Sequence, residues 1–131
     1  MKTECTLRVR TYECDSYGHV NNANYLNYLE AARYEFLRDI GFNYLAVVKA
    51  GYGVYTTRIE IDYRKPAVTD DELRIKSWPV KKGAVSGVMI QEIWRGEDLL
   101  AAAKVTWVFV DTRGVPVKIP REWDLPGLRP E

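Results

Sequence analysis

The feature that most constrains the fold is the hydrophobic period, which is two near the start of the chain, about 3.6 over the next segment and two again afterwards. Apolar side chains at three- and four-residue steps predict one long amphipathic helix; they are Tyr25, Leu29, Ala32, Phe36 and Ile40. Asn21 or Asn22 can cap its start through a side-chain oxygen, and Gly41 stands where such a helix ends. The chain is therefore predicted to carry one long helix early in its length.

Alternating apolar and polar residues on either side of this helix predict β-strands. The expected strands are Thr6 to Tyr12, Tyr55 to Arg64, Leu73 to Val80, Val85 to Arg95 and Leu99 to Asp111, with turns at Lys81-Lys82-Gly83 and Gly96-Glu97-Asp98. In the second strand, one face is expected to carry Tyr55, Thr57, Ile59, Ile61 and Tyr63. Prolines crowd the end of the chain and predict an irregular strap there. The pattern predicts a single α+β domain over residues 1–131, an antiparallel sheet packed on one long helix.

Composition narrows the classes of function. The 19 Lys and Arg residues nearly balance the 18 Asp and Glu residues, so no overall field favours a nucleic acid or an anionic membrane as partner. No apolar run is long enough to span a bilayer, and the segment from Met1 to Arg10 is unlike a signal peptide, so a cytoplasmic protein is expected. With Cys5, Cys14 and one histidine, we expect free thiols and no metal site. Cys14 is expected to be a small hydrophobe rather than a nucleophile.

One short segment combines residue types that are typical of a catalytic site. Residues 15–25 read Asp-Ser-Tyr-Gly-His-Val-Asn-Asn-Ala-Asn-Tyr, which joins an acid, a glycine three residues on, a His-Val-Asn-Asn loop and a tyrosine in the first turn of the helix. This segment resembles the signature of the hotdog-fold acyl-CoA thioesterases, the 4-hydroxybenzoyl-CoA thioesterase-like family. The resemblance implies a sheet wrapped around a central helix, hydrolysis of an acyl-CoA without a metal or organic cofactor, and a homodimer or homotetramer with sheets joined edge to edge and active sites between subunits.

The resemblance also implies roles for three residues. Asp15 corresponds to the catalytic acid, Gly18 to the turn glycine, and Asn22 to the residue whose backbone N–H polarises the thioester carbonyl. The unpaired N–H groups at a helix N-terminus can indeed stabilise the charge that develops on that oxygen. An aspartate is ordinarily ionised at neutral pH, so Asp15 would act as a base or a nucleophile, and the sequence leaves both open. Taken alone, Asp15 would be a capping or turn aspartate.

The neighbouring residues have more modest expected roles. Asn21 and the single histidine, His19, are expected to order the loop, with proton transfer by His19 as the alternative. Tyr25 and Tyr28 are candidates for the acyl pocket, although aromatic residues at helical spacing often belong to the core. Lys81 and Lys82 are candidates for contact with the phosphates of coenzyme A or are simply a solvated turn.

Two rival functions remain open at this point. An enoyl-thioester hydratase or dehydratase of the same fold would need a histidine paired with a second acid or base, and His19 lies outside such a context. A non-catalytic acyl-CoA-binding module would use Asp15 only as a cap. The sequence decides neither the acyl group nor whether the carrier is coenzyme A or an acyl carrier protein.

Overall fold

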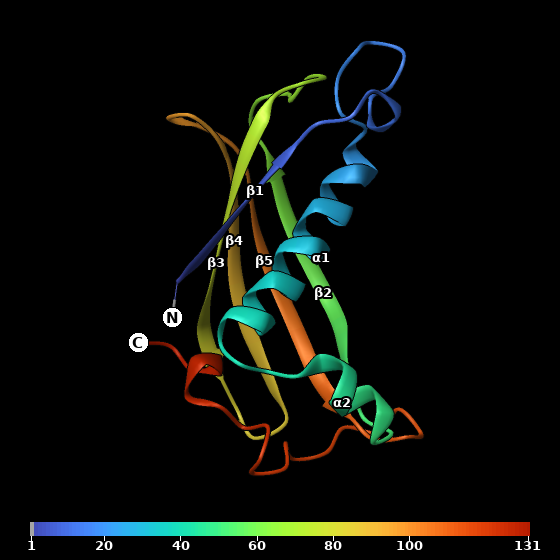
Figure 1. The fold of residues 1–131 in the computed structure, drawn as a ribbon, viewed down its shortest axis with the longest axis vertical. Coiled ribbons are helices and arrows are strands. Elements are labelled where there is room, and N and C mark those ends of the chain that lie inside the picture. The colour runs from blue at the N-terminus through green and yellow to red at the C-terminus, as the bar shows by residue number, and fades with distance from the viewer. Residues whose placement is uncertain (1) are drawn as a thin grey trace.

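The computed structural model describes residues 2–131 and shows a long helix lying across one face of a curved antiparallel sheet (Figure 1). The strands are β1 (Thr3–Arg8), β2 (Gly53–Tyr63), β3 (Glu72–Lys82), β4 (Ser86–Arg95) and β5 (Asp98–Val110), and the helices are α1 (Asn22–Asp39) and α2 (Tyr44–Lys49). Short 3-10 turns cover Thr11–Glu13 and Pro126–Leu128. The sheet has five strands in the order β1-β3-β4-β5-β2. The predicted α+β architecture is confirmed.

Helix α1 begins and ends as its sequence indicates. The Asn21 side chain accepts a hydrogen bond from the Ala23 N–H at 2.9 Å and is the cap. Ile40 leaves the helix, and Gly41 follows at φ +83°, a left-handed conformation that glycine adopts without penalty. The side chains of α1 that face the sheet are buried, as the period of 3.6 predicts; they are Tyr25, Tyr28, Leu29, Ala32 and Phe36.

The core divides into two clusters along α1. The first packs the N-terminal half of the helix against the middle of the sheet, with Leu29, Leu73, Ile93 and Val105 at its centre. The second lies beneath the C-terminal half of the helix and includes side chains from α2, from β4 and β5 and from the tail; they are Phe36, Phe42, Val47, Met89, Phe109, Ile119 and Leu128. The predicted irregular tail therefore closes this end of the core through Ile119 and Leu128.

The main differences from the prediction are the first strand, a second helix and the end of β3. The first strand covers Thr3–Arg8 rather than Thr6 to Tyr12, because it pairs antiparallel with β3 and that partner begins at Glu72, opposite Arg8. Helix α2 was not predicted, since its single turn and a half is too short to show a period. Strand β3 extends through Lys82, so Lys81 and Lys82 belong to the strand and not to the turn.

A β-bulge changes the faces of β2. The register against β5 shifts between Thr56 and Arg58, and an extra residue in a strand reverses the alternation beyond it. The expectation that Tyr55 and Thr57 share a face with Ile59 and Tyr63 is therefore wrong. The row facing α1 instead runs through Val54, Thr56, Ile59, Ile61 and Tyr63.

Candidate active site

The loop that carries Asp15 is a tight turn ahead of α1. The Asp15 N–H donates to the His19 carbonyl at 2.8 Å, and the Gly18 N–H donates to the Asp15 carbonyl at 3.0 Å. Gly18 has a φ of +79°, which explains the need for glycine at this point. Asp15 Oδ1 accepts the Tyr17 N–H at 2.9 Å in an Asx turn. This turn holds the carboxylate at the surface while fixing its direction.

The first backbone donor of α1 is free to bind a ligand. The Ala23 N–H donates to the Asn21 side chain, and the Asn24 N–H donates to the Asn21 carbonyl at 2.8 Å. Among the described residues, the Asn22 N–H has no acceptor. A helix N-terminus carries partial positive charge on such unpaired N–H groups. The Asn22 N–H can therefore stabilise negative charge on a bound carbonyl oxygen.

Asp15 and Asn22 line the same open hollow, which has a volume of about 380 Å³. His19, Val20 and Tyr25 line it from the loop and the helix, and Tyr63 to Pro66 line it from the end of β2. Tyr63 connects the two sides, because its hydroxyl donates to the Asn22 carbonyl at 3.0 Å and its ring lies 5.2 Å from the Tyr25 ring, edge to face. The contribution of β2 was missed at the sequence level, since nothing in the order of residues brings position 63 beside position 22.

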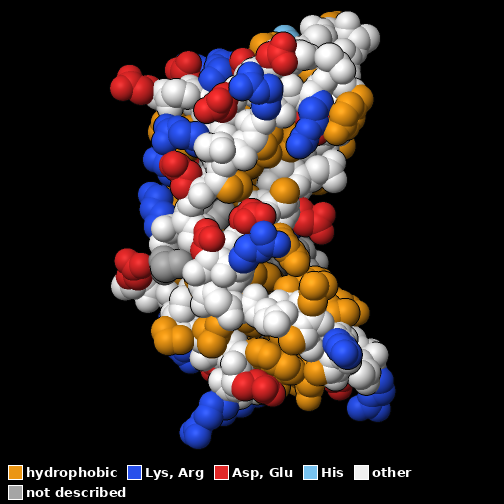
Figure 2. Space-filling view, viewed as in Figure 1, with side chains coloured by type: hydrophobic (Ala, Val, Ile, Leu, Met, Phe, Trp, Pro, Cys, Tyr) orange, Lys and Arg blue, Asp and Glu red, His pale blue; other side chains and the backbone are white. Residues whose placement is uncertain are grey.

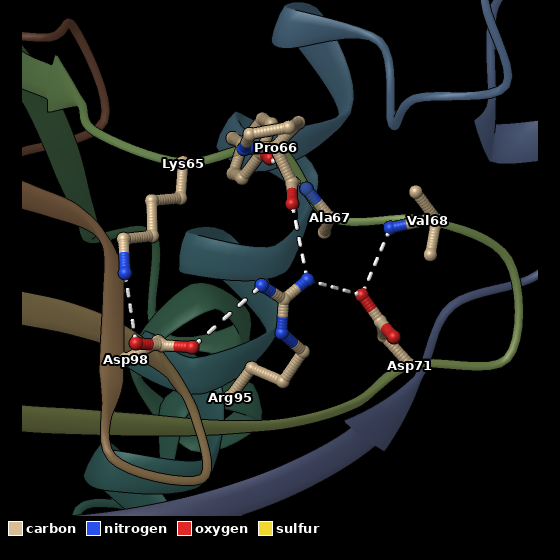
Figure 3. Close-up of polar contacts among 8 residues, drawn as sticks. Lys65, Pro66, Ala67, Val68, Asp71, Arg95 and Asp98 are labelled. Atoms are coloured by element: carbon tan, nitrogen blue, oxygen red, sulfur yellow. Dashed lines mark hydrogen bonds and ion pairs between the residues drawn. The ribbon is translucent and has the colours of Figure 1, made fainter.

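A network of charged residues holds the wall of this hollow (Figure 3). The Arg95 guanidinium donates to the Pro66 carbonyl at 3.1 Å and to Asp71 Oδ2 at 2.8 Å. The same Asp71 oxygen accepts the Val68 N–H at 2.9 Å. Lys65 forms an ion pair with Asp98 at 2.8 Å, and Arg95 lies 3.9 Å from the other oxygen of that carboxylate. The segment from position 65 to position 71 is thus tied to the β4–β5 hairpin.

That fixed segment in turn anchors the loop that carries Asp15. The Val20 N–H donates to the Ala67 carbonyl at 2.8 Å. The Ala67 N–H donates to the Tyr25 hydroxyl at 3.0 Å, and His19 forms an isolated antiparallel bridge with Val68. Tyr25 is therefore both a buried core residue and part of the wall of the hollow. Its position agrees with the acyl-pocket hypothesis without testing it.

Tyr28 takes the core position that was the alternative to the acyl pocket. It is buried, and its hydroxyl donates to Glu13 Oε1 at 2.8 Å rather than facing the hollow. Glu13 also accepts the Arg10 N–H at 2.8 Å and the Arg10 guanidinium at 3.0 Å. Its own carbonyl accepts the Asn21 N–H at 2.8 Å. Glu13 and Tyr28 therefore fix the backbone directly before Asn22, a function that the helical period alone does not reveal.

The charge of Glu13 is stabilised in this setting. Burial raises the pKa of the Glu13 carboxyl, but hydrogen bonds from Arg10 and Tyr28 together with the Arg10 charge outweigh that effect and hold the pKa below its usual value. Burial and the hydrogen bond to Glu13 both raise the pKa of Tyr28. At neutral pH the pair is a carboxylate with a neutral phenol as donor.

The other candidate residues are His19, the two cysteines, Lys81 and Lys82. His19 is exposed, and no acid among the described residues forms an ion pair or hydrogen bond with its ring. Cys5 and Cys14 are free and half-buried, and Cys14 Sγ lies 3.3 Å from the Thr69 hydroxyl. Lys81 and Lys82 are the last residues of β3, and this end of β3 lies at the opposite end of the sheet from the loop ahead of α1 (Figure 1). The Lys82 side chain is buried and forms an ion pair with Asp124 at 3.5 Å.

Charged and hydrophobic side chains occupy different parts of the surface around the helix (Figure 2). Acidic and basic side chains are interspersed over the upper part of this face, whereas hydrophobic side chains gather over its lower part, around α2. Leu45 and Val48 of α2 are among the exposed large apolar residues. In the described part of the chain, no helix combines the length and apolar character that crossing a membrane requires.

A long helix on a five-stranded antiparallel sheet, with an acid-bearing turn beside the free N–H at the start of that helix, defines a hotdog-fold protein of the thioesterase type. The model of the thioesterase-like superfamily matches residues 9–125. The chain belongs to this superfamily.

Individual relatives agree with the family. A long-chain acyl-CoA thioesterase of Escherichia coli K12 is 36% identical over 110 residues, which cover 82% of each chain. A chloroplastic acyl-acyl carrier protein thioesterase of Arabidopsis thaliana is 31% identical over 89% of this chain, and the match spans only 63% of that relative. The crystal structure of a probable thioesterase from Bartonella henselae superposes with a TM-score of 0.88 at 31% identity, covering 92% of this chain and all of the other.

Proposed function

We propose that this protein is an acyl-CoA thioesterase that cleaves an acyl-CoA to the free carboxylic acid and coenzyme A. The observation that carries the proposal is the pairing of the Asp15 carboxylate with the unengaged Asn22 N–H in one hollow. Relatives that are thioesterases support it, including one that is 36% identical. A thioester carbonyl bound with its oxygen at Asn22 would present its carbon to the side of the hollow that Asp15 lines.

The proposed reaction uses water as the nucleophile. Asp15 takes a proton from a water molecule, the water oxygen attacks the carbonyl carbon, and the Asn22 N–H stabilises the charge on the carbonyl oxygen. The carbon–sulfur bond then breaks, and the thiolate of the carrier takes up the proton. A donor such as the Asn22 N–H contributes about 3 kcal/mol to such a transition state. Direct attack by Asp15 to form a mixed anhydride is the alternative route.

The two routes differ in the fate of oxygen. In a single turnover in water enriched in ¹⁸O, the activated-water route places the label in the product acid. The anhydride route can place it in the Asp15 carboxylate instead, when water attacks the aspartyl carbonyl. Mass spectrometry of both the acid and the peptide containing Asp15 separates them, and label in the peptide would contradict the proposed route.

The carrier is proposed to reach the hollow past Arg64 and Lys65. Both line it, and the Arg64 side chain has no hydrogen bond or ion pair with another described residue. The charges of Lys65, Arg95, Asp71 and Asp98 sum to zero, and Arg64 adds one positive charge to the hollow that the Asp15 carboxylate also lines. A guanidinium suits the phosphate groups of coenzyme A. Within one protomer this rim, rather than Lys81 and Lys82, adjoins Asp15.

We also propose a homodimer, with a homotetramer as a further possibility. Strand β2 is at one edge of the sheet, and an edge strand presents unpaired backbone groups to a second chain. Tyr55 and Tyr63 of this strand are about half exposed, at 54% and 47%. A second copy paired along β2 would cover both tyrosines and lie beside the hollow. A cytoplasmic location stays a prediction.

Thiol release from a panel of acyl-CoAs tests the function. Short, long and aromatic acyl groups are incubated with the protein, and free thiol is measured with a chromogenic disulfide. The proposal predicts turnover of at least one of them. Hydration of an enoyl-CoA without thiol release would favour the hydratase, and tight binding with no thiol from any member would favour the non-catalytic module. Either result would overturn the proposal.

A further inference from the structure

A second cavity, partly open to the surface at Glu30 and Tyr34, lies under the C-terminal half of α1. Its volume is about 170 Å³, and its walls come from α1, β2, β4, β5 and the tail; they include Phe36, Leu37, Val54, Met89, Phe109 and Ile119. Of the polar groups that adjoin it, the Arg33 guanidinium donates to the buried Gln91 amide oxygen at 3.0 Å. The cavity is therefore an apolar space that suits a hydrocarbon.

The cavity and the hollow of Asp15 share two walls. Helix α1 lines the hollow through Asn22 and Tyr25 and the cavity from Glu30 onward. Strand β2 lines the hollow through Tyr63 and the cavity through Thr56 and Val54. Ile59 and Ile61 lie between these points and pack only partly buried against the first core cluster. The backbone of α1 approaches β1 and β3 more closely than it approaches β2.

The distance between the hollow and the cavity sets a minimum length for the acyl chain. A helix rises 1.5 Å per residue, so the cavity extends from about 12 Å beyond Asn22 at Glu30 to about 22 Å at Leu37. Carbon–carbon bonds are about 1.5 Å long and advance less than that in a zigzag chain. An acyl chain held at Asn22 therefore needs at least about eight carbons to reach the cavity and about fifteen to reach its far end.

The volume agrees with that length. If a methylene occupies about the volume of a water molecule, roughly 30 Å³, the cavity holds about six methylenes. Six carbons beyond the eight that bridge the gap give a chain of about fourteen. Short acyl groups and a single aromatic ring would stop before the cavity.

We propose that this cavity receives the distal end of the substrate's acyl chain, so that the enzyme is selective for saturated or unsaturated fatty acyl thioesters of about fourteen to sixteen carbons. This inference rests on the proposed thioesterase function and deepens it. Burial of a methylene contributes about 0.8 kcal/mol, which is about fourfold in kcat/KM for each carbon that enters. The cavity thereby selects chain length about 20 Å from the reacting carbon, a distance that the rise of α1 sets.

The test is a chain-length series with variants of the cavity wall. The wild type is assayed with acyl-CoAs of four to eighteen carbons, and kcat/KM is expected to rise steeply beyond about eight carbons and to level off near sixteen. Val54→Phe fills the cavity. We expect it to lower kcat/KM for the sixteen-carbon substrate, relative to the eight-carbon substrate, by at least tenfold, because it excludes about two methylenes. Leu37→Ala enlarges it and is expected to shift the plateau to longer chains.

A matched control and a second readout keep the test decisive. Val115 is 45% exposed and lies outside the cavity wall, so Val115→Phe is expected to leave the whole series unchanged. Binding of a non-hydrolysable sixteen-carbon thioether analogue should weaken in Val54→Phe and not in Val115→Phe. A flat chain-length series in the wild type, or an unchanged ratio in folded Val54→Phe, would overturn the cavity assignment while leaving thiol release intact. Absence of thiol release from every acyl-CoA would instead refute the proposed function.

Discussion

Removal of the Tyr28 hydroxyl tests whether the Glu13 network supports the loop that carries Asp15. In Tyr28→Phe, the buried Glu13 carboxylate loses the donor at 2.8 Å and keeps only its two bonds from Arg10. A hydrogen bond to a charged group contributes about 1.5–3 kcal/mol, so we expect a loss of about 2 kcal/mol in the free energy of unfolding. Unfolding entropy of about 2.1 cal/mol/K per residue converts that loss to a Tm lower by about 7 °C.

Thermal and urea unfolding of the variant beside the wild type give both quantities. Turnover measured well below the lowered Tm is expected to fall as well, because the backbone carbonyl of Glu13 accepts the Asn21 N–H next to the proposed oxyanion donor. Tyr12→Phe is the matched control, since Tyr12 lies in the same turn and is 78% exposed. A Tm within about 1 °C of the wild type in Tyr28→Phe would refute the reasoning about this network.

Two further perturbations probe the same loop. The pKa of Glu13 is lower in the folded protein than in the unfolded chain, so the stability that its carboxylate contributes is present above the unfolded pKa and is lost as the pH falls through the folded pKa. The difference in unfolding free energy between the wild type and Glu13→Gln should therefore shrink on acidification. A difference that does not depend on pH would contradict this. The Cβ that Gly18→Ala adds meets no atom within 4 Å, so only the φ of +79° at this position opposes the substitution. The free energy of unfolding should fall by about 1 kcal/mol, and by less in Gly18→Asn.

Much of the fold follows from local rules in the sequence. The period of 3.6 identified α1, and the alternation with turn residues identified β2 to β5, because these elements bury one face each. The bulge in β2 could not be predicted, since it depends on the register with β5 and not on the residues of β2 alone. Helix α2 is likewise fixed by tertiary packing, with Val47 fully buried in the second cluster.

The candidate site could likewise be predicted only in part from the sequence. Asp15, Gly18 and Asn22 were identified through the resemblance of one short segment to a family signature, and the structure brings Asp15 and Asn22 to one hollow. Tyr63 and Arg64 could not be found that way, because only the curvature of the sheet brings the end of β2 beside the start of α1. Lys81 and Lys82 were chosen for their charge at an expected hairpin turn, and they end β3 at the end of the sheet opposite the loop ahead of α1.

The most direct test of the proposed mechanism is turnover by Asp15→Asn. The amide oxygen that this substitution introduces can still accept the Tyr17 N–H, so the turn and the Tm should be retained. The control is Asp39→Asn, which makes the same change at an exposed position at the C-terminal end of α1. Loss of a positioned proton acceptor lowers turnover by roughly 10² or more. A fall of that size with an unchanged Tm, absent in Asp39→Asn, is the predicted result, and near-normal turnover in Asp15→Asn would contradict the account.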